Sequence, residues 1–294
     1  MSLNTDHGKT LTYDKSNNTE VYYDEEDDDG EQWIESDHFE LIPNVELERD
    51  VILINGSSGK GKSTLAKNYA LNYRLLFPKN NIFMFSQFPA NYDKAYMYAF
   101  NEKTHKNDGK DIRKILNIRF VELNKEFMNK KIDIVKDIHD ALIIFDDFED
   151  IDDEDMEDIE EKDEEVEYDD YGEEKKKKTK KRGKGDTIVN KINKVIRQVL
   201  KLGRKNNISA LILGHVLYGE TGQTALFRVE MTEAHRLVFF KDDNEFQIRR
   251  ALNTRFGLDQ RTISNIFDIK KSRWICVNKS DPKYVLTETC CELL

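Results

Sequence analysis

The sequence predicts an α/β fold in which a mostly parallel central sheet is covered by helices on both faces. Several short apolar runs lack the polar alternation of a half-exposed strand, and the run at 51–55 (VILIN) is one of them. Segments with helical periodicity separate these runs, most clearly at 187–202. Strands of this kind, connected through helices, are typical of a parallel sheet that is buried on both sides.

The expected elements follow one another in a regular order. Buried strands are expected at 51–55, 81–86, 118–123, 141–147, 209–215 and 236–241. Helices are expected at 62–77, where Pro78 ends the pattern, at 124–137 and at 187–202. From residue 274 onward the sequence indicates short strands and loops.

Charge divides the chain into unlike parts. Residues 1–40 hold 13 acidic residues and two lysines, and we interpret them as a largely disordered acidic tail. Residues 149–174 hold 18 acidic residues, and 175–184 hold eight lysines and arginines. Because blocks of like charge repel one another, 149–185 is expected to be a flexible insertion within a folded domain at 41–294. The rest of that domain is net basic, which suits a polyanionic partner.

Several protein classes are excluded by composition. No apolar run approaches the roughly 18–20 residues that cross a bilayer, and the first residues lack a signal-peptide pattern. The three cysteines, Cys276, Cys290 and Cys291, support neither a disulfide framework nor a zinc site. A soluble protein in a reducing compartment is therefore expected.

A glycine-rich motif, GSSGKGKS, stands between the strand at 51–55 and the helix at 62–77. In such a P-loop, glycines let consecutive backbone N–H groups turn towards phosphate oxygens, and the following helix directs its positive end at them. Lys62 would reach the β- and γ-phosphates, and the Ser63 hydroxyl would ligate Mg²⁺. A glycine-rich turn without function is the alternative, and the flanking strand and helix disfavour it. The residues expected to bind ATP are Gly56, Ser57, Ser58, Gly59, Lys60, Gly61, Lys62, Ser63 and Thr64.

The strand at 141–147 has the form of the second P-loop element, an apolar run that ends in two acids. Asp146 is expected to hold Mg²⁺, directly or through water. Asp147 is expected to orient and polarise the attacking water. The alternative is a strand that only ends in solvated acids, and the acidic tract that follows makes this a rival interpretation.

Two further residues are candidates for catalysis. His215 ends the strand at 209–215, where a polar side chain could sense the γ-phosphate. Arg204 lies in the connection before that strand, and an arginine there could reach the γ-phosphate of a neighbouring subunit. Arg197 and Arg228 are alternatives for the same role. An ordinary strand-end histidine and a solvated loop cation are the structural alternatives.

These segments, in this order, resemble the FtsK–HerA superfamily of P-loop ATPases, and within it the genome-packaging ATPases of poxviruses, giant DNA viruses and their smaller relatives. The resemblance covers most of 45–260 and rests on 56–64, 81–86, 142–147, 203–209 with 211–215, and 233–241. It implies a RecA-like fold, a homo-oligomeric ring (pentamer or hexamer), ATP hydrolysis between subunits, and translocation of double-stranded DNA. It also implies capsid or membrane proteins of a virion as partners, in the host cytoplasm, the viral factory or the virion. Relatives more often have glutamine where this chain has His215, and the charged insertion is unusually long.

Two other functions stay open on the sequence. A P-loop kinase of a small acceptor would need a mobile lid, and no arginine-rich lid motif is apparent. A nucleotide-gated scaffold would bind ATP without turnover, and the pair Asp146–Asp147 argues against it. For a DNA motor, the basic residues of the last third are candidate DNA contacts or a solvated surface: Arg249, Arg250, Arg255, Arg261, Lys270, Lys271 and Arg273.

Overall fold

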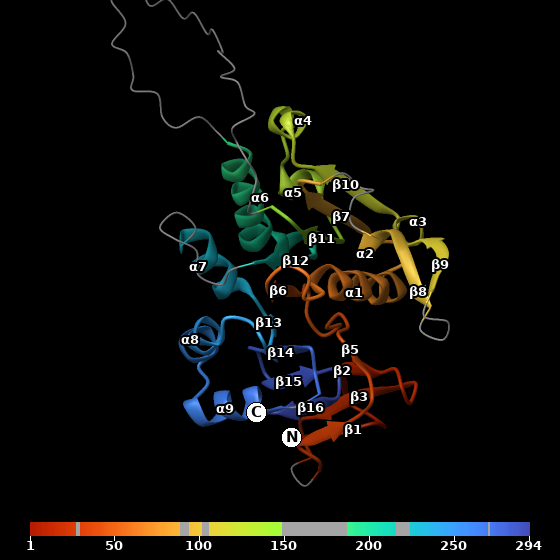
Figure 1. Cartoon of the computed structure of the whole chain (residues 1–294), viewed down its shortest axis with the longest axis vertical. Helices are drawn as coiled ribbons and strands as arrows, with labels where there is room; N and C mark the ends of the chain where they lie inside the picture. Colours follow the sequence, from red (N-terminus) through yellow and green to blue (C-terminus); the bar gives the residue numbers. More distant parts are fainter. Residues whose placement is uncertain (28–29, 89–93, 102–105, 149–186, 216–223, 270) are drawn as a thin grey trace, which may run out of the picture.

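The computed structural model of the chain describes all residues except 28–29, 89–93, 102–105, 149–186, 216–223 and 270. Its central sheet has the strand order β10-β7-β11-β12-β6-β13-β14-β15-β16-β4 (Figure 1). The parallel strands are β10 (Ile118–Glu122), β7 (Asn81–Ser86), β11 (Ala141–Phe145), β12 (Ile208–Gly214), β6 (Val51–Asn55) and β13 (Arg236–Phe240). Antiparallel pairing continues the sheet through β14 (Trp274–Asn278), β15 (Tyr284–Thr287), β16 (Cys290–Leu293) and β4 (Trp33–Glu35).

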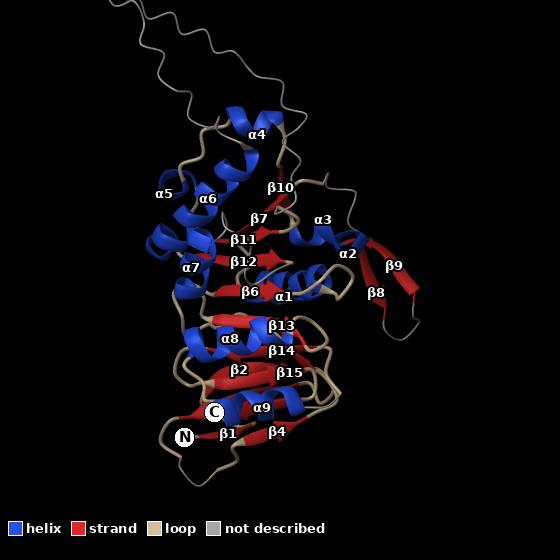
Figure 2. Cartoon of the chain, turned by 60° about the vertical axis from the view of Figure 1, so that its left-hand side comes forward, coloured by secondary structure: helices blue, strands red, loops and turns tan. Residues whose placement is uncertain are grey.

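The expected α/β fold with a mostly parallel sheet is confirmed. All residues of β6, β11 and β13 are buried, because helices or further strands cover both faces of the sheet (Figure 2). The antiparallel extension beyond β13 did not follow from the sequence pattern, which indicated only short strands there. The connections from β14 to β15 (279–283) and from β15 to β16 (288–289) are short and allow antiparallel neighbours, whereas a parallel partner needs a long crossover.

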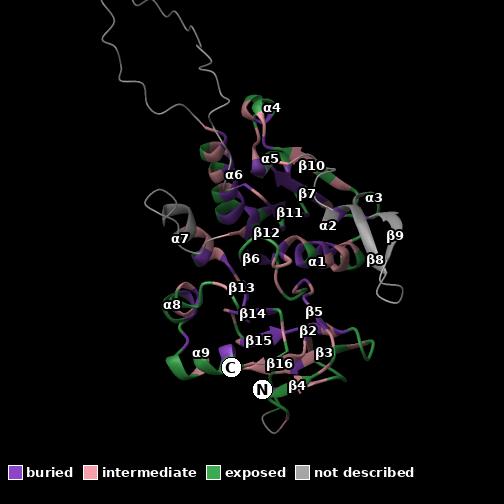
Figure 3. Cartoon of the chain, viewed as in Figure 1, coloured by how far each residue is buried: buried purple, intermediate pink, exposed green. Residues whose placement is uncertain are grey.

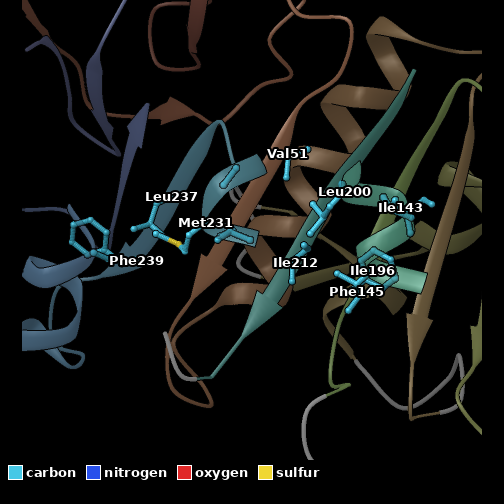
Figure 4. Packing of buried hydrophobic residues seen from close by; sticks show 14 of the residues in the cluster. Val51, Ile143, Phe145, Ile196, Leu200, Ile212, Met231, Leu237 and Phe239 are labelled. Carbon is cyan, nitrogen blue, oxygen red and sulfur yellow. The ribbon is translucent and has the colours of Figure 1, made fainter. Parts of the chain in front are cut away.

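Successive residues of the central strands point to opposite faces and build two cores. Val51 and Leu53 of β6 belong to the core that α6 (Ile188–Leu202) covers, together with α7 (Thr224–Glu233), α8 (Glu245–Phe256) and α9 (Gln260–Asp268). Ile52 and Ile54 belong to the core that α1 (Lys62–Leu76) covers. The first core is shown in Figure 4, and Figure 3 shows that burial is concentrated along the central strands.

The predicted helix at 124–137 is wrong as a single element, because two short helices occupy this range. They are α4 (Lys125–Asn129) and α5 (Ile134–Asp137). Lys130 after α4 is extended, and the Lys191 ammonium of α6 binds the carbonyl oxygens of Phe127, Met128 and Lys130 at 2.5–2.7 Å. A cation at these carbonyls stabilises a helix end, which explains the break.

The expectation of a disordered tail at 1–40 is also wrong. The segment forms a sheet in the order β1 (Ser2–Asn4), β3 (Thr19–Asp24), β2 (Lys9–Asp14) and β5 (Phe39–Glu40), and it also supplies β4. Leu11 and Val21 of this sheet are buried in the same core as Trp274 and Tyr284. The acidic composition concealed alternating inward-facing apolar residues, while acids such as Glu20 lie on the exposed side.

The structure also describes several short elements in the connections between the strands. They are α2 (Lys94–Met97), α3 (Ile112–Leu116), the hairpin β8 (Tyr98–Asn101) with β9 (Lys106–Asp111), and a 3₁₀ turn at Gly203–Asn206. The predicted charged insertion lies outside the described residues. Within the described ranges, no helix is both long and apolar enough to cross a membrane.

A buried polar cluster fixes the amino end of β6. The Asp50 carboxylate accepts hydrogen bonds from the Tyr69 hydroxyl at 2.9 Å and from the Arg236 guanidinium, and all three side chains are buried. Beside them, the His235 imidazole accepts a hydrogen bond from the Val51 backbone N–H at 3.2 Å through Nδ1. Burial, with the nearby charge of Arg49 and other cations, lowers the pKa of His235 from 6.5 to about 4.

This lowered pKa predicts an acid-dependent loss of stability. The unfolded chain takes up the His235 proton more readily than the folded chain, so the free energy of unfolding should fall as pH drops from about 6.5 to about 4, by up to about 3 kcal/mol. His235→Asn keeps an acceptor for Val51 and does not titrate in this range. Urea denaturation of the unaltered protein and of His235→Asn, at about pH 7 and about pH 4.5, isolates the contribution of His235 to the free energy of unfolding. If this free energy fell equally with pH in both proteins, the prediction would be contradicted.

Candidate nucleotide-binding site

The candidate site lies where β6, β12 and β11 end at the same edge of the sheet. β12 runs between the other two strands, and Gly214 at its end pairs with Asn55 at the end of β6. The P-loop therefore leaves β6 close to the points where His215 leaves β12 and Asp146 leaves β11. Ligands of open α/β sheets bind at the carboxyl ends of such strands. The parallel sheet thus brings the three predicted segments to one edge, as expected from the sequence.

The P-loop turns into α1 through glycines in the left-handed backbone region. Gly61 has φ 104° and stands at the N-cap of α1, which begins at Lys62 without a side-chain cap. A residue with a Cβ rarely adopts this conformation, so the turn requires glycine. The first N–H groups of an α-helix have no partner within the helix and can bind an anion, which the positive end of the helix dipole favours.

The start of the P-loop is packed tightly against the end of β13. A Cβ on Gly56 would lie 2.5 Å from Cδ2 of Phe240 and 3.1 Å from an oxygen of Asp243. The Phe240 side chain is only 3% exposed and cannot swing away easily. Glycine at position 56 is therefore required by this close approach.

The Lys62 side chain is buried inside the loop that precedes it. Its Nζ donates to the Gly56 carbonyl oxygen at 2.6 Å and to the Ser57 carbonyl oxygen at 3.2 Å, and lies 3.3 Å from His215 Nδ1. The ammonium thus stands at the centre of the loop, where it supplies a positive charge next to the N-terminus of α1.

The Ser63 hydroxyl and the Asp146 carboxylate meet across the site. Ser63 Oγ donates to Asp146 Oδ2 at 3.0 Å, and the Tyr96 hydroxyl donates to the same oxygen at 3.1 Å. Asp146 and Tyr96 are 1% and 2% exposed. Sequence reasoning missed Tyr96, because a tyrosine on the short helix α2 carries no motif and its role appears only through a contact 50 positions away.

Asp147 and His215 form the second polar pair of the site. Asp147 has φ 48°, a left-handed conformation that Asp and Asn tolerate better than most residues, so the chain turns sharply after β11. Its Oδ1 lies 3.7 Å from His215 Nε2. Since His215 Nδ1 faces Lys62, the imidazole stands between the P-loop lysine and the predicted water-orienting carboxylate.

The outer residues of the P-loop face solvent or a neighbouring turn. Ser58 and Thr64 are exposed. The Ser57 N–H donates to Asp243 at 2.7 Å, and Lys60 Nζ lies 3.7 Å from the Asp242 carboxylate. These two acids, in the turn between β13 and α8, were not among the residues predicted from the sequence.

Arg204 does not join this site within one chain. It stands before β12, whereas His215 stands after it, so a whole strand of roughly 20 Å separates the two ends. Its guanidinium is exposed and pairs with Glu48 at 2.8 Å. Arg197 is exposed on α6, and the Arg228 side chain lies outside the described residues. A role for Arg204 at the γ-phosphate would require a second subunit.

Comparisons with known proteins found a relative by sequence and several proteins by structure. No family model matches it. Protein V3 of Sputnik virophage is 27% identical over 270 residues, which cover 91% of this chain and 87% of V3. The genome-packaging NTPase B204 of Sulfolobus turreted icosahedral virus 2, in complex with ATPγS, aligns with a TM-score of 0.44 at 11% identity, over 82% of this chain and 97% of B204. The pCW3 conjugation coupling protein TcpA aligns with a TM-score of 0.42 at 11% identity, over 96% of this chain and 76% of TcpA. The chain is similar to all three.

The close packing of Gly56 gives a test of the site's construction. In Gly56→Ala the added methyl group would overlap the Phe240 ring, and the P-loop and β13 would have to move apart. Overpacking of this kind costs about 1–3 kcal/mol in the free energy of unfolding. Urea denaturation should detect the loss, with the exposed Ser58→Ala as the matched control. Equal stability of the two variants would contradict the close approach.

Proposed function

We propose that this protein is an ATPase that binds ATP with Mg²⁺ through its P-loop and uses hydrolysis to move double-stranded DNA during the packaging of a viral genome. The contact that carries the proposal is the hydrogen bond from Ser63 Oγ to Asp146 Oδ2. It joins residues 83 positions apart, one from each element of a P-loop site, at the end of α1 that favours an anion.

The binding of a triphosphate follows from the residues around the loop. The backbone N–H groups from Gly59 to Thr64 would donate to the phosphate oxygens, and α1 directs its positive end at the same place. The Lys60 N–H would exchange its contact with the Ser57 carbonyl oxygen, now at 3.4 Å, for one of these bonds. The Lys62 ammonium would exchange its hydrogen bonds with Gly56 and Ser57 for bonds to the β- and γ-phosphates.

The donors of the site fit a magnesium ion. Ser63 and Asp146 offer a hydroxyl and a carboxylate, and Mg²⁺ prefers oxygen ligands and keeps several waters and phosphate oxygens. Ser63 and Asp146 would hold the ion, which offsets the charge of the β- and γ-phosphates. Tyr96 would keep the Asp146 carboxylate oriented, because its hydroxyl binds the oxygen that faces Ser63.

Hydrolysis would depend on Asp147. Its carboxylate would accept a hydrogen bond from a water molecule and orient the water oxygen for attack on the γ-phosphorus in line with the leaving oxygen. His215 would hold the Asp147 carboxylate on one side and approach Lys62 on the other, so it is a suitable sensor of the γ-phosphate.

The DNA-moving part of the proposal has separate support. The sequence resembles genome-packaging ATPases, and the proteins similar to this chain come from a virophage and from a virus whose NTPase is named for genome packaging. The net basic charge of residues 41–148 taken together with 185–294 suits a nucleic acid, whereas the folded sheet at 1–40 is acidic. A homo-oligomeric ring, with Arg204 acting on a neighbouring subunit and with capsid or membrane proteins as partners in the viral factory, belongs to the same proposal.

Substitution of Asp147 tests the chemistry. Asp147→Asn removes the charge but tolerates the same left-handed backbone, so the fold should be kept. ATP turnover should fall by about 100-fold or more, while nucleotide affinity should change little. Phosphate release and the binding of a fluorescent ATP analogue measure the two quantities, and Asp137→Asn at an exposed distant position is the control. Unchanged turnover would remove Asp147 from the mechanism, and ATP binding without turnover in the unaltered protein would favour the nucleotide-gated scaffold.

A second experiment tests the substrate. Long duplex DNA should raise ATP turnover by this protein several-fold, because a motor hydrolyses ATP in step with its track. The stimulation should weaken as salt increases, since counterion release contributes to binding of the DNA backbone. A P-loop kinase of a small acceptor, the alternative function, should not respond to DNA. Light scattering with and without ATP would measure whether a ring forms.

A further inference from the structure

The turn between β13 and α8 contacts the beginning of the P-loop at successive residues. The Ser57 N–H donates to Asp243 Oδ2 at 2.7 Å, and Gly56 packs against the Phe240 ring. A backbone N–H that donates to a carboxylate makes a stronger bond than one that donates to a neutral oxygen. The first residues of the P-loop are therefore held by the turn between β13 and α8, whereas its last residues are held by α1.

The turn itself is held rigidly. The Asp243 N–H donates to the Phe240 carbonyl oxygen at 3.0 Å, and the Asn244 side chain caps α8 by accepting from the Gln247 N–H at 3.3 Å. Phe240 is buried in the core. The carboxylate of Asp243 thus has a defined position relative to the sheet. Its hydrogen bond holds Ser57 in a defined position as well.

A carboxylate beside a triphosphate site is electrostatically unfavourable, because like charges repel. If the side chain at position 243 only faced solvent, a neutral or basic residue there would suit the binding of a triphosphate better than an acid. The hydrogen bond to Ser57 gives the carboxylate a different role. It engages the N–H of Ser57 and so fixes the start of the loop.

We propose that Asp243 is a positioning residue of the nucleotide site, which holds Ser57 so that the P-loop is set in its phosphate-binding shape before the nucleotide arrives. The proposal rests on the proposed function, since it assigns the loop to a triphosphate. Asp243 touches no reacting atom, so it should act on nucleotide affinity and KM and leave kcat nearly unchanged.

The neighbouring acid provides a matched control. The Asp242 side chain is 88% exposed and faces Lys60 at 3.7 Å, and exposed pairs of this kind contribute little. Asp242→Ala removes the same charge one residue away and leaves the acceptor of Ser57 in place. Asp243→Asn removes the charge of Asp243 but keeps an oxygen acceptor, whereas Asp243→Ala removes both.

Two measurements on the full chain test the proposal. Solvent exchange of the Ser57 amide, followed by NMR without nucleotide, reports the contact itself. It should accelerate by about tenfold in Asp243→Ala and stay near the unaltered rate in Asp243→Asn and Asp242→Ala. The dissociation constant of a fluorescent ATP analogue should rise by about tenfold in Asp243→Ala only.

Results other than these would contradict either the positioning role of Asp243 or the proposed function. An unchanged Ser57 exchange rate in Asp243→Ala, or unchanged affinity with accelerated exchange, overturns the positioning role. Tighter binding in Asp243→Ala, Asp243→Asn and Asp242→Ala alike would mean that Asp243 acts only as a charge, which also overturns it. If the unaltered protein fails to bind the analogue while the Ser57 exchange rate still responds to Asp243→Ala, the proposed function fails and the structural contact stands.

Discussion

The parallel register of β6, β12 and β11 is the constraint on which the site depends. Parallel pairing places the carboxyl ends of these strands at the same edge of the sheet. Because side chains alternate along a strand, the register decides which face of the sheet each residue occupies. A slip of one residue would exchange the two cores, placing Ile52 against α6 and Val51 against α1. It would also move one strand end by roughly 3.3 Å, which is enough to break the contact between Ser63 and Asp146.

β13 is joined to β6 at both ends by polar contacts of different kinds. At the amino end, Arg236 forms a buried ion pair with Asp50, and such a pair adds little net stability but is costly to break because one charge would be left unpaired. At the carboxyl end, Asp243 receives the N–H of Ser57. The two contacts determine how β13 lies along β6, and hence how the start of the P-loop is held.

The sequence was informative where one local pattern determines one structure. Apolar runs without alternation predicted the parallel strands, and the glycine motif between a strand and a helix predicted the loop at 56–61. Composition was misleading for 1–40, because acids such as Glu20 lie on the exposed side of a sheet whose inner side is largely apolar. Tyr96 and Asp243 could not be predicted from the sequence, since the contacts that place them in the site are with residues far away in the chain. The helix break after α4 likewise depends on Lys191, more than 60 positions away.

The sheet at the start of the chain completes its core with the strands at the end. Leu11 and Val21 pack with Tyr284 and Leu286, and Cys291 in β16 pairs with Ile34 in β4. During synthesis residues 2–24 leave the ribosome while residues 274–293 are still missing, so the apolar side of the first sheet lacks these partners until that segment has emerged. Contacts of such long sequence separation form late, because a large loop must close before they can stabilise anything. The contacts between these two segments can therefore form only after the strands around the P-loop have been synthesised.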